Sequence, residues 1–303
     1  MTEPLTPEVS PLPRPKGPLV IIGGAEERDG EAKILRAFIQ LAGGRSAQIV
    51  VLTAATSEPI EAGETYIEVF ERLGAKTVWV VDTRDPDDAN QFEAVWAIRQ
   101  ASGIFFTGGD QARIVERIKG TILEDAIQKR HSEGAVIAGT SAGAAIMPEV
   151  MIVRGESETS PRNDAVMLGA GMGFVSGMVV DQHFAQRGRL GRLLTALVLQ
   201  PSIIGVGVDE NTALIVKGDE FEVLGEGAVT IVDESELTYK SADFSVPVGA
   251  VAGWHQHSQQ VATGPNQVMS VFDIRLHILA EGCRFNLKTR QPIVANMATD
   301  EMD

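Results

Sequence analysis

A serine lies between two glycines in the sequence Gly139-Thr-Ser141-Ala-Gly143, after an apolar run at 135–138 and before a stretch of small residues. This context is typical of a nucleophile elbow, in which the flanking glycines permit a sharp turn between strand and helix that exposes the serine hydroxyl. Ala142 would then start the helix, and its N–H could stabilise a developing oxyanion. Such a turn predicts acyl transfer at a carbonyl carbon.

Two other interpretations of this turn are possible from the local sequence. A phosphate cradle lacks support, because the chain has no Gly-rich loop followed by Lys-Ser/Thr and no Gly-x-Gly-x-x-Gly motif. A tight strand-to-helix connection with small packing residues remains an alternative. A partner base decides between them, since a serine nucleophile needs a general base within hydrogen-bond reach and a third group that orients the base.

We predict that His183 is this base. It follows an apolar segment at 173–180 and the polar residues Asp181 and Gln182, so it is expected at a strand end, as the serine is. A buried histidine bonded to a backbone carbonyl is the alternative. The five histidines of the chain are His131, His183, His255, His257 and His277.

The orienting carboxylate has two candidates, Asp209 and Glu210. Both end the apolar segment 203–208, which we expect to be another strand that leads to the same edge of a parallel sheet. Either side chain could therefore reach the histidine, and the spacing does not separate them.

A metal site and a cofactor are not expected. His255 and His257 would lie on one face of a strand, but no third ligand can be assigned, so a solvent-facing pair is the preferred interpretation. Cys283 is the single cysteine, which excludes an internal disulfide framework and any Cys-rich metal site. Acyl transfer from serine needs no cofactor.

The elements that must position these residues alternate along the chain. Apolar segments with Gly-rich turns alternate with helical segments, which predicts an α/β fold with an open, doubly wound, mostly parallel sheet and helices on both faces. Ligands of such sheets bind at the carboxyl ends of the strands, where the turn at 108–110 and Ser141 are expected. After Gly205, short β-like runs predict hairpins that flank the sheet in the C-terminal third.

Composition limits the class of protein. The 303 residues include 44% hydrophobic and 22% charged residues, and no apolar run approaches the roughly 18 residues that cross a bilayer. A net charge of −15 argues against nucleic-acid binding. We expect one catalytic domain at 18–295, between a proline-rich mobile tail at 1–17 and a weakly structured tail at 296–303. The first tail does not have the pattern of a secretory signal, so we expect a cytoplasmic protein.

The chain resembles the cyanophycinase family from Leu19 to about Ala295. Cyanophycinases are serine peptidases related to α-aspartyl dipeptidase, with a fold similar to class I glutamine amidotransferases. The resemblance rests on IIGGAEER at 21–28, FFTGGDQARI at 105–114, AGTSAGAAIM at 138–147, DQHFAQRGRLGRL at 181–193, GVGVDENTAL at 205–214 and FNLKTRQP at 285–292.

The resemblance implies a triad of Ser141, His183 and Glu210, in a chain order that differs from the Ser, Asp/Glu, His order of α/β-hydrolases. It implies no amide transfer from glutamine, because amidotransferases carry cysteine in the elbow. The oxyanion would meet the N–H of Ala142 and an N–H of the Gly-rich turn, from Gly109.

The resemblance also implies a substrate, cyanophycin, which has a poly-aspartate backbone with arginine joined to each β-carboxyl group. Exopeptidase cleavage of its backbone releases β-Asp-Arg dipeptides. Three arginines within 187–192 would bind carboxylates, on a helix that begins near Phe184; a solvated helix face is the alternative. The implied substrate-binding residues are Gln111, Asp181, Gln182, Arg187, Arg189 and Arg192.

Two rival functions stay open. An α-aspartyl dipeptidase would share the elbow but act on small peptides, and a non-catalytic module would hold an acidic peptide or a nucleotide in the same crevice. Related enzymes imply a homodimer.

Overall fold

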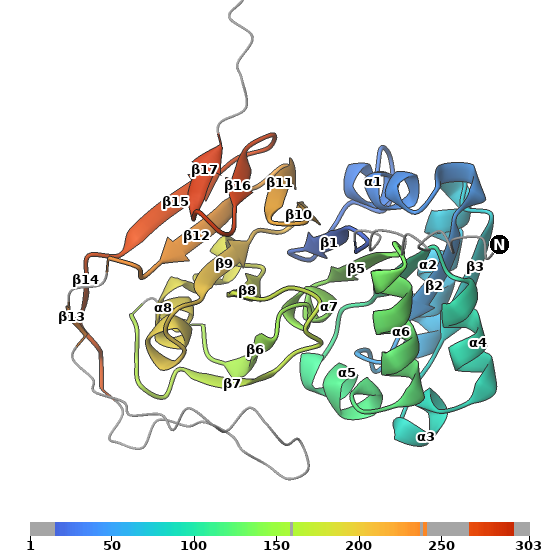
Figure 1. Cartoon of the computed structure of the whole chain (residues 1–303), viewed down its shortest axis with the longest axis horizontal. Helices are drawn as coiled ribbons and strands as arrows, with labels where there is room; N and C mark the ends of the chain where they lie inside the picture. The colour runs from blue at the N-terminus through green and yellow to red at the C-terminus, as the bar shows by residue number, and fades with distance from the viewer. Residues whose placement is uncertain (1–15, 158–159, 237–238, 241–266, 294–303) are drawn as a thin grey trace, which may run out of the picture.

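A nine-stranded sheet forms the centre of the fold, with strand order β17-β16-β11-β10-β1-β5-β4-β2-β3 (Figure 1). The computed structural model describes residues 16–157, 160–236, 239–240 and 267–293. The parallel part of the sheet contains β1 (Leu19–Ile22), β5 (Val136–Thr140), β4 (Gly103–Phe106), β2 (Gln48–Leu52) and β3 (Thr77–Val81). The antiparallel part contains β10 (Thr212–Lys217), β11 (Glu220–Gly225), β16 (Arg284–Asn286) and β17 (Gln291–Ile293).

The parallel strands are short apolar runs because helices cover both of their faces. Every residue of β1, β4 and β5 is buried. Alternate side chains of β1 point to opposite faces, so Val20 packs in one cluster with Phe38 while Ile21 packs in another with Phe106. Burying each large side chain of this kind stabilises the fold by about 1.5–3 kcal/mol.

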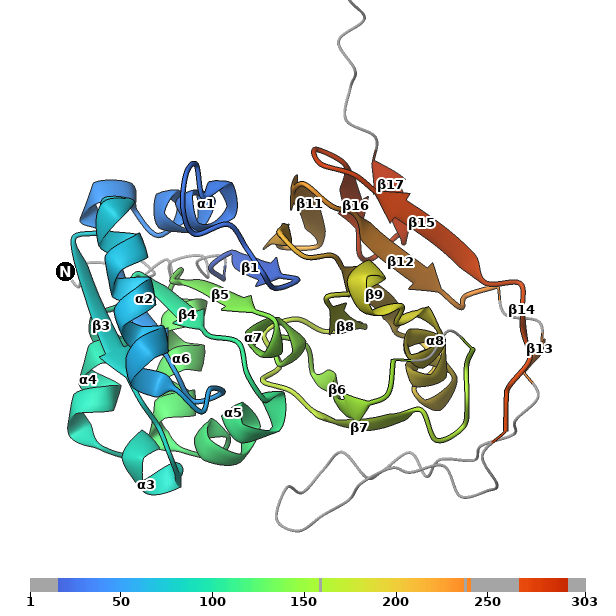
Figure 2. The same cartoon turned by 180° about the vertical axis from the view of Figure 1, so that it is seen from behind.

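Two layers of helices cover the sheet. One face carries α1 (Lys33–Leu41) and α2 (Pro59–Arg72), and the other carries α4 (Phe92–Gln100), α5 (Gln111–Ile118) and α6 (Ile122–Ser132) (Figures 1 and 2). The short helices α3 (Pro86–Ala89) and α7 (Ala142–Ala145) and the 3-10 turn η1 (Gly44–Ser46) lie between these elements. The predicted α/β class, with a mostly parallel sheet and C-terminal antiparallel strands, is confirmed.

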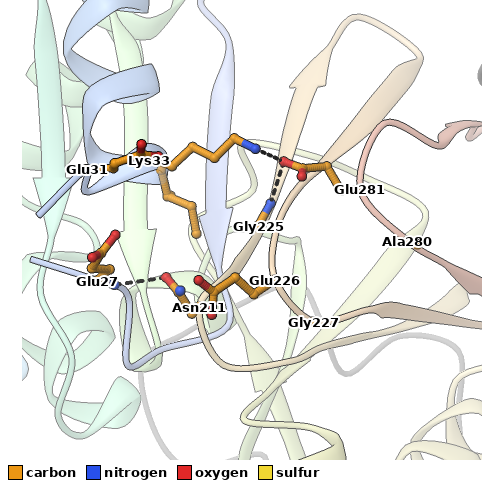
Figure 3. A pocket seen from close by; sticks show the side chains of 10 residues that line it. Glu27, Glu31, Lys33, Asn211, Gly225, Glu226, Gly227, Ala280 and Glu281 are labelled. Carbon is orange, nitrogen blue, oxygen red and sulfur yellow. Dashed lines mark hydrogen bonds and ion pairs between the residues drawn. The ribbon is translucent and has the colours of Figure 1, made fainter.

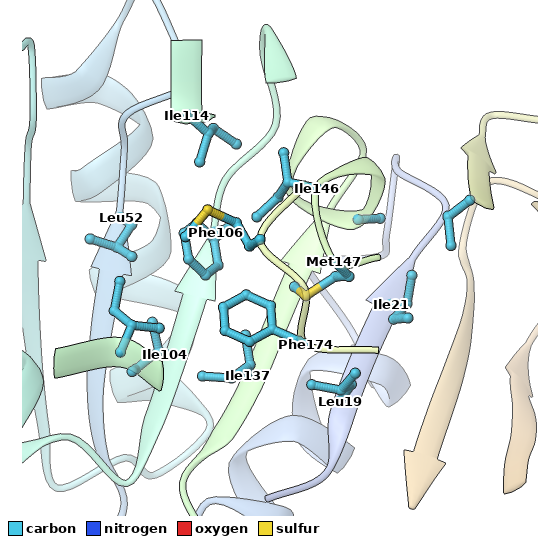
Figure 4. Close-up of a cluster of buried hydrophobic side chains, with 14 of the residues drawn as sticks. Leu19, Ile21, Leu52, Ile104, Phe106, Ile114, Ile137, Ile146, Met147 and Phe174 are labelled. Carbon is cyan, nitrogen blue, oxygen red and sulfur yellow. The ribbon is translucent and has the colours of Figure 1, made fainter. Parts of the chain in front are cut away.

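The core under α5 and α7 lies directly behind the Gly139–Gly143 turn. Phe106, Met147 and Phe174 meet there, beside Ile21 and Ile137 of the sheet (Figure 4). The turn that carries Ser141 therefore rests on fully packed apolar side chains, which restrict its movement.

A second sheet of four strands, in the order β15-β12-β9-β8, lies beside the first. It contains β8 (Met178–Gln182), β9 (Ile204–Val208), β12 (Val229–Asp233) and β15 (Arg275–Leu279). β8 and β9 are parallel and are joined through η2 (Ala185–Arg187) and α8 (Leu190–Leu199). Our expectation that the strand before Glu210 belongs to the main parallel sheet is wrong, because β9 pairs with β8 and β12 instead.

The remaining strands form small antiparallel pairs. β6 (Val150–Gly155) pairs with β7 (Val166–Ala170), and β13 (Tyr239–Lys240) pairs with β14 (Val271–Phe272). Of the hairpins predicted after Gly205, one is found at β10–β11, and β16–β17 is a further antiparallel pair that we did not predict. His255 and His257, like residues 1–15 and the predicted tail at 296–303, lie outside the described residues.

Gly17, which we assigned to the N-terminal tail, contacts the folded part. Its N–H donates to the backbone oxygen of His131 at 2.8 Å, and its own carbonyl oxygen lies 2.8 Å from Nε2 of the same histidine. Burial lowers the pKa of His131, against the raising effect of this hydrogen bond. None of the described helices is long and apolar enough to cross a membrane.

Candidate active site

Ser141 occupies the turn between β5 and α7 in a conformation that is rare for a residue with a side chain. Its φ is 53° and its ψ is −111°, and such a conformation costs about 1–3 kcal/mol, so that surrounding contacts must hold it. The two glycines of the motif permit those contacts. A Cβ atom at Gly139 would lie 2.3 Å from the backbone oxygen of Gly143, and one at Gly143 would lie 2.4 Å from that of Phe106.

His183 follows β8 and approaches the serine from the second sheet. Its Nε2 atom lies 3.0 Å from Oγ of Ser141. Its φ is 47°, and its N–H donates to the carbonyl oxygen of Gly23 at 2.8 Å. Gly24 lies against the imidazole ring, so close that an added Cβ atom would be 2.4 Å from the ring.

Glu210 is the carboxylate that contacts the histidine. Its Oε1 atom lies 2.5 Å from Nδ1 of His183. Asp209 instead accepts backbone hydrogen bonds, from Ala185 at 3.0 Å and from Ala228 at 3.1 Å. A proton on Nδ1 that is bonded to Glu210 leaves Nε2 free to accept the serine proton. The geometry therefore separates the two carboxylates, which their spacing in the sequence could not.

The backbone N–H groups of Gly109 and Ala142 are the two that we expect to meet an oxyanion. Gly108 lies close to the serine, since a Cβ atom there would be 3.4 Å from Cβ of Ser141. Gly109 has a φ of 140° and passes so near Ala55 that a Cβ atom would lie 2.2 Å from its carbonyl oxygen. Among the described residues, neither Gly109 nor Ala142 donates its N–H to a protein acceptor.

The two predicted glutamines have different positions. Gln182 is buried beside Ser141, and its Oε1 atom lies 3.4 Å from Oγ of Ser141. Gln111 donates from Nε2 to the carbonyl oxygens of Ile152 at 3.0 Å and Val153 at 2.6 Å. Its amide nitrogen thus attaches the start of α5 to β6.

The three arginines that we expect to bind substrate carboxylates have different surroundings. A 3-10 turn, η2, follows Phe184, and the α-helix α8 begins only at Leu190. Arg187 alone of the three arginines is exposed. Arg189 and Arg192 have side-chain exposures of only 7% and 5%. The solvated helix face that we considered for them is therefore contradicted.

Both buried arginines bind Asp181, whose side chain is also buried. Arg192 makes two hydrogen bonds to the carboxylate, one of them from Nε to Oδ2 at 2.6 Å, and Arg189 donates to Oδ1 at 3.2 Å. Burial lowers the pKa of Arg189 to about 10, although Asp181 opposes this effect. The Asp181 carboxylate is thus paired with the guanidinium groups of Arg189 and Arg192 inside the protein. We had expected it to bind a guanidinium group of the substrate, and the structure does not support that contact.

A pocket of about 440 Å³ lies beyond Asn211, the residue that follows Glu210 (Figure 3). Lys33 pairs with Glu281 across it, and the Oδ1 atom of Asn211 accepts the N–H of Glu27 at 2.9 Å. No sequence pattern indicates this pocket, because its walls come from widely separated segments. Its carboxylates are Glu27, Glu31, Glu226 and Glu281. No cluster of described residues is arranged to hold a metal ion.

Glu26 is a further buried group near the serine, and we did not predict it from the sequence. Glu26 accepts hydrogen bonds from the hydroxyl of Tyr66 at 2.6 Å and from that of Thr140, the residue before Ser141. Arg28 lies 3.5 Å from the same carboxylate and 5.0 Å above the ring of Tyr66. The only signal in the sequence was a carboxylate two residues after Gly23-Gly24.

Comparison with known sequences decides the family. Residues 19–224 match the sequence model of Peptidase family S51. The chain belongs to this family. The turn that carries Ser141, and the residues His183 and Glu210, thus lie in an S51 peptidase. The predicted resemblance to cyanophycinases is confirmed at the level of the family.

Two curated relatives of this S51 peptidase cover most of its length. The cyanophycinase of Nostoc sp. (strain PCC 7120) is 36% identical over 282 residues, which are 92% of this chain and 89% of the relative. The cyanophycinase of Geminocystis herdmanii is 37% identical over 277 residues, which are 91% of this chain and 95% of the relative. A crystal structure of a peptidase from an acI-B1 Actinobacterium has a TM-score of 0.58 and 23% identity, and covers 72% of this chain and 91% of its own. This last similarity supports the fold.

Proposed function

We propose that this S51 peptidase is a serine peptidase with Ser141 as nucleophile, His183 as general base and Glu210 as the group that orients the base. One observation carries the proposal. The chain of contacts from Oγ of Ser141 to Nε2 of His183 at 3.0 Å, and from Nδ1 to Glu210 at 2.5 Å, has the geometry that a serine nucleophile requires.

The reaction we propose is acyl transfer in two steps. His183 takes the proton of Ser141 while Oγ attacks the carbonyl carbon of a backbone peptide bond. The tetrahedral oxyanion accepts hydrogen bonds from the N–H groups of Ala142 and Gly109. His183 then gives the proton to the leaving amine, and a water molecule, activated in the same way, releases the acyl group and restores the serine.

The substrate we propose is cyanophycin, cleaved from a chain end to release β-Asp-Arg dipeptides. The support is the similarity of more than 90% of the chain to proteins named cyanophycinase. We expect Gln182, whose Oε1 atom lies 3.4 Å from Oγ of Ser141, and the exposed Arg187 to bind the amide and carboxylate groups of such a substrate. Gln111 would border this site through β6, and Asp181, Arg189 and Arg192 would support it from inside, since Arg189 donates to the carbonyl oxygen of Gln182.

We also propose a cytoplasmic homodimer with one catalytic domain over residues 18–295. Strands from both ends of the chain share the nine-stranded sheet, which favours a single domain. A single cysteine, Cys283, fits a reducing compartment. The homodimer rests on the resemblance to related enzymes, and sedimentation that gives about twice the 32.4 kDa chain mass would support it.

The deciding experiment incubates the purified protein with cyanophycin, in parallel with the Ser141→Ala variant, and identifies soluble products by mass spectrometry. We expect β-Asp-Arg from the wild type and none from the variant. Equal hydrolysis by both proteins would disprove Ser141 as nucleophile. Cleavage of Asp-Leu without cleavage of cyanophycin would instead favour an α-aspartyl dipeptidase, and ligand binding without reaction with a fluorophosphonate would favour a non-catalytic module.

A further inference from the structure

One short loop, residues 22–26, contacts all three segments that carry the proposed triad. The carbonyl oxygen of Ile22 accepts the N–H of Ser141 at 3.0 Å, and that of Gly23 accepts the N–H of His183 at 2.8 Å. The carbonyl oxygen of Gly24 accepts the N–H of Asn211, the residue after Glu210, at 2.9 Å. Three successive carbonyl groups therefore align three strand ends from two different sheets.

Both reacting residues need such external support. Ser141 has a φ of 53° and His183 a φ of 47°, a conformation that residues with a side chain keep only when their surroundings hold it. The loop is itself sharply bent, with positive φ at Gly24 and at Ala25. A loop of this shape needs an anchor of its own if it is to hold the triad.

Glu26 is the anchor that the structure provides. Its side chain is fully buried, and it accepts hydrogen bonds from two hydroxyl groups that lie in separate elements. The hydroxyl of Tyr66 in α2 donates at 2.6 Å, and the hydroxyl of Thr140 at the end of β5 donates to the other carboxylate oxygen. Burial, with the Glu26 carboxylate beside it, raises the pKa of Tyr66 well above its ordinary value, so its hydroxyl keeps its proton.

We infer that Glu26 is a positioning residue, which acts through the hydroxyl of Thr140 to hold the Ser141 turn in register with the loop that aligns His183. The inference rests on the proposed function, because it assigns Glu26 to the geometry of that triad. Thr140 is one residue from the nucleophile and Glu26 is two residues from Gly24, so their hydrogen bond links the turn to the loop beside the imidazole.

The test compares one substitution at two buried threonines. Thr140→Val keeps the shape of the side chain and removes the hydroxyl that binds Glu26. Thr121→Val is the matched control, because Thr121 is also buried and its hydroxyl both donates to the carbonyl oxygen of Ile118 and accepts the N–H of Glu124, at the start of α6. Thr140→Ser retains the hydroxyl and serves as the rescue variant. Glu26→Gln keeps the shape of the carboxylate but loses its charge.

The readout is the second-order rate at which a fluorophosphonate labels Ser141, together with kcat and KM on cyanophycin and the melting temperature. We expect Thr140→Val to lower the labelling rate and kcat by roughly 10- to 100-fold at nearly constant KM, since a small misplacement of reacting groups has effects of this size. Thr140→Ser should restore most of the rate, and Thr121→Val should lower the melting temperature without slowing labelling. In the Glu26→Gln/Thr140→Val double variant the two losses should not add, because both remove the same link.

The outcomes separate this inference from the proposed function. If the wild type is not labelled, the serine peptidase proposal fails. If the wild type is labelled and the Thr140→Val and Glu26→Gln variants react at its rate, or if Thr140→Val and Thr121→Val lose rate equally, the positioning role of Glu26 is overturned. Should Thr140→Val not fold, Glu26→Gln and Thr140→Ser carry the same comparison.

Discussion

Glu210 approaches Nδ1 of His183 to 2.5 Å, whereas the neighbouring carboxylate of Asp209 turns away and binds the backbone N–H groups of Ala185 and Ala228. Two adjacent acidic residues therefore have different surroundings, one against the imidazole of His183 and the other in the connection between η2 and β12.

These surroundings predict opposite effects of two matched amide substitutions. Glu210→Gln should lower kcat by roughly 10³- to 10⁴-fold with little change in stability, because an amide does not hold the histidine in the required tautomer. Asp209→Asn should leave kcat near the wild-type value but destabilise the fold by about 1–3 kcal/mol, because the hydrogen bonds to a charged acceptor are weakened. Steady-state kinetics and urea unfolding measure the two effects. A large loss of kcat in Asp209→Asn alone would reverse the assignment.

The second prediction compares alanine substitutions at Gly24 and Gly74. Its φ is 101°, and a Cβ atom there would lie 2.4 Å from the His183 ring. Gly74 has a φ of 92° and no atom within 4 Å of its added Cβ. Alanine at either position should cost about 1–2 kcal/mol of stability from the left-handed conformation, but Gly24→Ala should also displace the imidazole and slow hydrolysis. Equal kcat values for Gly24→Ala and Gly74→Ala would show that the contact with the ring is not needed.

We expect substitution of the buried Arg192 to lower stability, and substitution of the exposed Arg187 to weaken substrate binding. Arg192→Ala removes one partner of a buried ion pair, which typically costs about 3–5 kcal/mol. Arg187→Ala changes an exposed side chain, so its effect on stability should stay within about 0.5 kcal/mol while KM for cyanophycin rises. Thermal unfolding and kinetics of both variants test this. An unchanged KM in Arg187→Ala would remove Arg187 from the proposed substrate site.

His131 predicts a loss of stability on the acid side of neutrality. Burial lowers its pKa, so in the folded protein it releases its proton at a lower pH than in the unfolded chain. Between the lowered folded pKa and the ordinary value near 6.5, the unfolded state binds more protons, and stability falls as the pH falls through this window. His131→Asn should flatten this part of the pH dependence of urea unfolding. If the stability of His131→Asn depends on pH as that of the wild type does, other groups cause the acid sensitivity.

Much of the fold could be predicted, and Ser141 could be chosen as the candidate nucleophile, because both depend on local sequence. Continuous apolar runs such as those at 19–22 and 136–140 require cover on both faces, which indicates a parallel sheet with two layers of helices. The Gly139–Gly143 turn can be recognised from small residues within five positions, although contacts with other segments hold its conformation. Ser141 and His183 could therefore be chosen from residue types and their positions at strand ends.

The rest depended on contacts between distant segments, which a sequence alone does not rank. The strand before Glu210 had the apolar pattern of the main sheet, but its partners in the second sheet decided where it lies. Asp209 and Glu210 are adjacent acidic residues at the same strand end, so their spacing does not separate them. Only the direction of each side chain in the structure distinguishes them. Arg189 and Arg192 have the spacing of a solvated surface, yet Asp181 stabilises their charges inside the protein. By itself the sequence determined which residues could react, through local turns and hydrophobic patterns, whereas the tertiary structure decided which of them meet, because strand pairing and burial depend on residues far apart in the chain.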